Sequence, residues 1–138
     1  MLFKSLDKHR ELGILLLRLG IGLMFVYHGW PKISGGPEVW LKLGAAMKFV
    51  GIGFTPVVWG FMAAVTEFFG GILIALGFLT RPAAMMLAFN MTIAVILKFS
   101  TGAGLGGASQ AIEVGIVFIS LILMGPGKYS IDARCQKR

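Results

Sequence analysis

Ionisable residues are rare inside the apolar stretches of this sequence, and those that occur there could do chemistry. Glu67 is the only ionisable residue in the apolar stretch 56–79 and lies near its middle. A carboxylate at the centre of a bilayer is disfavoured by about 2.5–3.5 kcal/mol. We therefore expect Glu67 to be neutral, or to face a cation or trapped water inside a bundle of helices.

Two further polar residues, Arg18 and Asn90, occur inside other apolar stretches. Counting about 1.5 Å per residue along each helix places them close to Glu67 in depth. We expect one central polar cluster in which Arg18 pairs with Glu67. Two interpretations are open: a structural ion pair that fixes the helix register, or a site that binds a ligand or moves protons. Asn90 suits either an interhelical hydrogen bond or a ligand contact.

A second polar cluster is expected nearer the outer end of the bundle, which is the end away from both termini. His28 lies near the end of the first apolar stretch, Lys98 near the end of the third, and Glu113 about one turn into the fourth. Lys32 is close to His28 in the sequence. Glu113 could pair with Lys98 or line a site, and His28 could exchange a proton with a ligand or simply lie at the membrane interface.

The composition is that of a membrane protein. Of the 138 residues, 57% are hydrophobic and 14% charged, with a formal net charge of +7. The basic residues cluster at the ends of apolar runs, which indicates anionic lipid headgroups rather than nucleic acid as the counter-charge. Cys135 is the single cysteine, so the chain cannot form its own disulfide, and the two histidines are too far apart to share a metal ion.

The apolar runs predict an all-α fold, an integral membrane four-helix bundle that forms one domain over residues 1–138. Stretches of this length can cross a bilayer core of about 30 Å. We expect Pro31 to end the first span, and a glycine-rich loop at 102–107 to precede the last. Between the first two spans, Pro37 and an apolar face predict a short amphipathic helix at the interface. The expected spans are 12–30, 55–79, 83–99 and 110–124, with the amphipathic helix at 38–50.

Basic residues divide unequally between the two sides of such a bundle. Four spans place both termini on one side, which then carries eight lysines and arginines against four on the other. The positive-inside rule predicts cytoplasmic N and C termini. The eight are Lys4, Lys8, Arg10, Arg81, Lys128, Arg134, Lys137 and Arg138.

Several short motifs, taken in order, resemble the DoxX family of membrane proteins. They are Leu17-Arg18-Leu19, Tyr27-His28-Gly29-x-x-Lys32, Glu67-x-x-Gly70-Gly71, Gly77-x-x-Thr80-Arg81 and Gly125-Pro126-Gly127-Lys128-Tyr129-Ser130-Ile131-Asp132. The resemblance implies a four-helix bundle in a prokaryotic plasma (inner) membrane. It also implies a link to redox chemistry, because some relatives are subunits of a thiosulfate:quinone oxidoreductase and others associate with redox enzymes.

Three functions are consistent with these residues. The first is a small membrane module that binds a quinone or other lipidic molecule in support of redox enzymes, at most as an accessory subunit of a quinone-linked oxidoreductase. The second is a binding or transport bundle without a redox role. The third is a scaffold for a soluble partner, in which the buried charges are structural. Glycine-rich faces would also permit a homo-oligomer.

Overall fold

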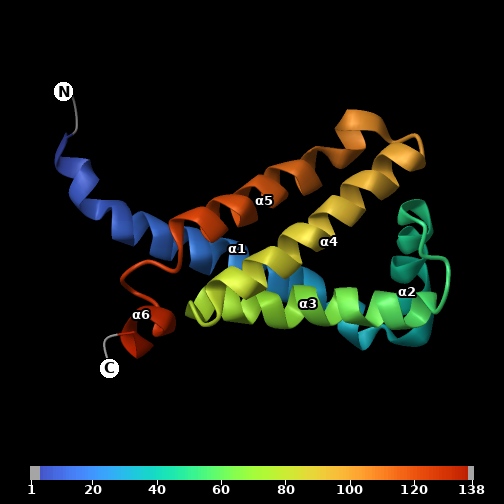
Figure 1. The fold of residues 1–138 in the computed structure, drawn as a ribbon, viewed down its shortest axis with the longest axis horizontal. Coiled ribbons are helices and arrows are strands. Elements are labelled where there is room, and N and C mark those ends of the chain that lie inside the picture. Colours follow the sequence, from blue (N-terminus) through green and yellow to red (C-terminus); the bar gives the residue numbers. More distant parts are fainter. Residues whose placement is uncertain (1–3, 137–138) are drawn as a thin grey trace.

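The computed structural model describes residues 4–136, which are almost entirely helical (Figure 1). Four helices are long and apolar enough to cross a membrane, which confirms the predicted four-span, all-α fold. Residues 1–3, and the basic residues Lys137 and Arg138 counted above, lie outside the described part. The elements are η1 (Lys4–His9), α1 (Arg10–Ser34), α2 (Gly36–Gly44), η2 (Ala45–Val50), α3 (Pro56–Leu76), α4 (Thr80–Ser100), α5 (Gly104–Met124) and α6 (Ile131–Cys135).

Three differences from the predicted boundaries are larger than the rest, which are shifts of one to three residues at the ends of α1, α3 and α4. Helix α1 continues through Pro31 to Ser34. Proline removes one backbone hydrogen-bond donor, but the helix does not end at this position. The predicted amphipathic helix 38–50 is two pieces, the α-helix α2 and the 3₁₀ helix η2. Helix α5 begins at Gly104, so most of the expected glycine-rich loop is helical; the added turns lengthen α5 to 21 residues.

Helices α1 and α3 pack closely and antiparallel through small residues. A Cβ atom on Gly22 would lie 2.6 Å from the carbonyl oxygen of Gly71, and one on Gly29 would lie 2.7 Å from the backbone nitrogen of Phe68. Only glycine allows backbones to approach this closely. These contacts fix the register in which α1 and α3 face each other.

The core lies where α3 and α4 leave their short connecting turn. Ile74, Leu87 and Leu121 are fully buried there. Phe25 of α1 and Phe118 of α5 meet edge to face, with ring centroids 4.9 Å apart. Beyond this core α3 and α4 diverge, and α2 lies at their open end (Figure 1). η2 packs against both α3 and α4 at that end.

Candidate functional site

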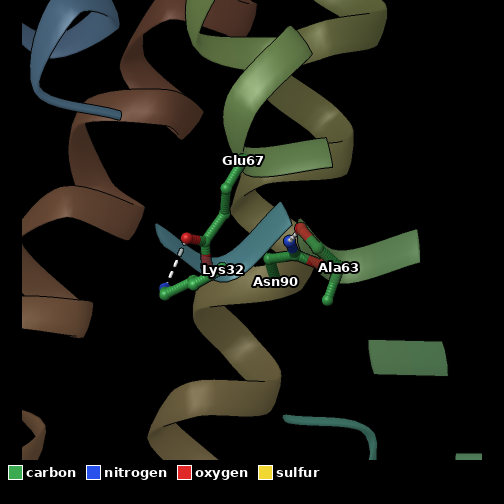
Figure 2. A network of polar contacts seen from close by, with 4 residues as sticks. All are labelled: Lys32, Ala63, Glu67 and Asn90. Carbon is green, nitrogen blue, oxygen red and sulfur yellow. Dashed lines mark hydrogen bonds and ion pairs between the residues drawn. The ribbon is translucent and has the colours of Figure 1, made fainter. Parts of the chain in front are cut away.

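Glu67 forms an ion pair with Lys32, the residue one position after Pro31 in α1 (Figure 2). Glu67 is 7% exposed. The side chain of Lys32 is about one-third exposed. A cation was one of the surroundings expected for Glu67, but it comes from Lys32 and not from the predicted Arg18.

Lys32 is held in place by the helix that follows it. The indole Nε1 of Trp40 donates a hydrogen bond to the carbonyl oxygen of Lys32 at 3.0 Å. The Trp40 ring also packs edge to face on Phe61 of α3, with centroids 4.8 Å apart. Trp40 therefore joins the end of α1, α2 and α3 beside the ion pair.

Asn90 joins α4 to α3 close to the ion pair. Its Nδ2 donates a hydrogen bond to the carbonyl oxygen of Ala63 at 3.0 Å (Figure 2). Ala63 lies one turn before Glu67 on α3. The interhelical role considered for Asn90 is thus present, and the residue also borders the cavity described next.

A cavity of about 380 Å³ lies between α3, α4 and the segment α2–η2. Lys32, Glu67 and Asn90 all line it, and Thr66 contributes a hydroxyl group. Most of the other walls are apolar, including Met47, Met62, Met86, Phe89, Ile93 and Leu97. The arrangement is a mainly apolar chamber with a few polar groups, which is typical of small-molecule sites.

Arg18 does not reach this cavity, and the predicted Arg18–Glu67 pair is wrong. Arg18 is 1% exposed, and its Nη2 donates a hydrogen bond to the carbonyl oxygen of Tyr129 at 2.7 Å. The antiparallel register explains the separation: Glu67 faces the end of α1 near Lys32, which is about 21 Å along the helix from Arg18. Arg18 instead abuts Gly77, where an added Cβ atom would lie 1.6 Å from its Nη1.

Arg18 belongs to a second polar site, in which the C-terminal segment closes over the turn between α3 and α4. The two carboxylate oxygens of Asp132 accept hydrogen bonds from the backbone N–H groups of Leu79 and Thr80, both at 2.9 Å. These groups begin α4, where a negative charge is favourable. Glu11 of α1 accepts another from the N–H of Lys128 at 2.6 Å. We call this arrangement the C-terminal clasp.

The clasp lowers the pKa of Asp132. Burial has the largest effect and raises the pKa of this carboxyl group. The hydrogen bonds from Thr80 and Leu79 and the positive charge of Arg18 together outweigh it, so the pKa is below the ordinary value of 3.8. Asp132 therefore stays ionised at neutral pH.

The predicted outer cluster of His28, Lys98 and Glu113 does not form. His28 is exposed, and its ring packs edge to face on Tyr27, with centroids 5.4 Å apart. Lys98 and Glu113 are both exposed, on α4 and α5 respectively. Among the side chains that the structure describes, the Lys32–Glu67 pair is the only ion pair.

Sequence reasoning missed two functional-site residues, Lys32 as the partner of Glu67 and Asp132 as the cap of α4. Both were visible within the short motifs that carried the family resemblance. Lys32 closes the motif that begins at Tyr27, and Asp132 closes the motif that begins at Gly125. The motifs do not show which helices meet, so these partners could not be assigned.

Four helices that can span a membrane, two of which enclose a mainly apolar cavity with a polar end, define a small multi-pass membrane protein. The chain belongs to the DoxX family, whose sequence profile matches residues 13–100. It is therefore an integral membrane protein in contact with the lipid bilayer.

Several curated proteins are similar over nearly the whole chain. Inner membrane protein YqjF of Escherichia coli is 29% identical over 96% of this chain and 99% of its own length. Inner membrane protein YphA of the same organism is 29% identical over 91% of both chains. A Bacillus subtilis protein named "Putative oxidoreductase CatD" is 27% identical over 92% of this chain and 90% of its own. No solved structure matches the chain significantly.

Proposed function

We propose that the cavity binds a quinone or another lipidic small molecule, in support of membrane-associated redox enzymes. The observation that carries the proposal is the position of the Lys32–Glu67 pair at the wall of an otherwise mainly apolar cavity inside the membrane bundle. Ionisable groups at such positions are usually functional. The name of the Bacillus subtilis relative supports a redox role for that protein.

The residues around the cavity fit the head of a quinone. A volume of about 380 Å³ is within the usual range for small-molecule sites. The Lys32 ammonium has three N–H donors, of which the ion pair uses one, so others remain for a carbonyl oxygen of the ligand. The apolar walls suit the faces of a flat ring.

Lys32 and Glu67 would have different roles at this site. A bound quinone supplies two-electron, two-proton redox chemistry, with the electrons exchanged with a partner redox enzyme. Lys32 orients the ring by donating to a carbonyl oxygen. The Glu67 carboxylate holds the Lys32 ammonium beside that oxygen through the ion pair, and the apolar walls exclude bulk water from both.

We also propose that the protein lies in the inner membrane with both termini in the cytoplasm. The support is the excess of lysine and arginine on the terminal side, eight against four. The names of the two Escherichia coli relatives are consistent with this membrane.

The direct test is to ask which small molecules remain bound to the purified protein. The chain is extracted in mild detergent, and bound lipids and quinones are identified by native mass spectrometry and by chromatography of an organic extract. We expect a quinone at close to one per chain in the wild-type protein. Its absence from preparations of intact, folded protein, even after added quinone, would refute the proposal.

Matched variants then locate the molecule. Lys32→Met and Glu67→Gln should each reduce the bound quinone, because the first removes the donor to the ring and the second removes the charge that holds Lys32 in place. Lys98→Met is the control. Lys98 is an exposed lysine on the spanning helix α4, but its side chain does not line the cavity. Equal losses in Lys98→Met and Lys32→Met would mean that the quinone binds elsewhere.

A further inference from the structure

The cavity has one side that faces the lipid. Met62 on α3 and Met85, Met86 and Phe89 on α4 line the cavity, yet they remain 50%, 52%, 52% and 56% exposed. All four lie on membrane-spanning helices. Exposed apolar surface on such helices faces the acyl chains of the bilayer. The cavity therefore opens sideways, between α3 and α4; we call these four residues the lateral mouth.

The end of the cavity beneath α2 and η2 is closed by tight packing. A Cβ atom on Gly44 would lie 1.6 Å from the carbonyl oxygen of Pro56, and one on Gly60 would lie 1.7 Å from that of Trp40. Met47 of η2 lines the cavity and is only 7% exposed. Backbones in such close contact move as one body, so α2 is a fixed cover over this end of the cavity.

We propose that the ligand is a membrane-resident molecule with a compact polar head and an apolar tail, and that the tail leaves through the lateral mouth. This rests on the quinone-binding function proposed above and names the ligand class of the same site. The head lies against Lys32 and Glu67, and the tail passes Met86 and Phe89 into the lipid. Methionine side chains are flexible and polarisable, so they adapt to a passing chain.

Asn90 is a positioning residue for this opening. Its hydrogen bond to the carbonyl oxygen of Ala63 joins α4 to α3 at the wall of the cavity. The bond limits how far the two helices separate beside the mouth.

Photolabelling of the wild-type protein tests the route. The protein is reconstituted in liposomes with a long-tailed quinone analogue that carries a diazirine in the first segment of its tail. Labelled peptides are then mapped by mass spectrometry. We expect label on Met62 and on residues 85–89, and loss of that label when unmodified long-tailed quinone competes. Competed label on Phe49 or Val50, near the covered end, would overturn the lateral route.

A steric variant gives a second, independent test. Met86→Trp should weaken binding of the long-tailed quinone by about tenfold or more, and should change binding of a tail-less analogue less than about twofold. Ile119→Trp is the control, because Ile119 is also 52% exposed on a spanning helix but does not line the cavity. Undiminished long-tail binding in a folded Met86→Trp protein would overturn the lateral route.

The outcomes separate the two proposals. If neither quinone binds the wild-type protein, the proposed function fails and the route fails with it. If both bind, but label and variant do not point to the mouth, the site stands and only the route is wrong.

Discussion

Lys32 and Glu67 are 35 positions apart, yet they form an ion pair that joins α1 to α3 at the wall of the cavity. In a membrane bundle neither group has another compensating charge, because no other ion pair occurs among the described side chains. A buried pair of this kind specifies how helices pack, and it can also serve a ligand. The first prediction distinguishes these roles.

Removing one partner should be more harmful than removing both. Lys32→Met or Glu67→Leu alone leaves an unpaired charge in the bundle, which we expect to cost about 1–3 kcal/mol. The double variant Lys32→Met/Glu67→Leu should regain most of that stability. Thermal unfolding in detergent measures the effect, with Lys98→Met as a control that stays close to wild type. If the double variant is stable but binds no quinone, the ion pair serves ligand binding and does more than specify how the helices pack.

The C-terminal clasp should stabilise the turn between α3 and α4. Asp132→Ala removes the acceptor for Leu79 and Thr80 at the start of α4, and loss of such a cap typically costs about 0.5–2 kcal/mol. Hydrogen exchange of these two amides should become faster. Asp7→Ala, at an exposed aspartate outside the clasp, should leave their exchange unchanged. Unchanged exchange in Asp132→Ala would show that the carboxylate contributes nothing to the cap.

The same clasp should weaken only in acid. Because the pKa of Asp132 is lowered in the folded protein, the carboxylate stabilises the fold above its unfolded pKa, close to 3.8. That stabilisation is lost as pH falls through the lower, folded-state pKa. The amide signals of Leu79 and Thr80, followed by NMR, should be constant between pH 8 and pH 5. The lower limit of this range is on the order of a unit above the ordinary carboxyl pKa. A transition near neutral pH would contradict the lowered pKa.

Gly77 should not tolerate even a methyl group. Its φ of +69° is unfavourable for other residues, and an added Cβ atom would lie 1.6 Å from Nη1 of Arg18. Gly102 has a similar φ of +78° but no atom within 4 Å of the added Cβ, so Gly102→Ala carries only the backbone cost. We expect Gly77→Ala to be less stable than Gly102→Ala by about 1–3 kcal/mol, the usual cost of overpacking. Equal thermal shifts would mean that Arg18 moves aside freely.

Cys135 offers a direct test of the proposed orientation. It is exposed and lies in α6, so it is open to reagents on its own side of the membrane. With cytoplasmic termini, a membrane-impermeant maleimide should label it only after the cells are permeabilised. Labelling of intact cells would reverse the topology.

The fold followed from the sequence because spans need long apolar runs, which are visible locally. The site was only partly predictable. Counting residues gave the depth of Glu67 in its own helix, but not the register in which α3 faces α1. That register depends on contacts such as Gly22 against Gly71, which join segments distant in the sequence. Capping of α4 by Asp132 likewise acts over 52 positions and leaves no periodic signal.

The bond from Arg18 to Tyr129 also constrains how the protein is made. The two residues are 111 positions apart, and the ribosome synthesises Arg18 long before Tyr129 exists. During that interval the first span carries a cation without its final acceptor, which is costly in lipid. The guanidinium gains this acceptor only once the segment after α5 has been translated. The contact that fixes Arg18 therefore forms only after α3, α4 and α5 have been translated, although α1 precedes all three in the chain.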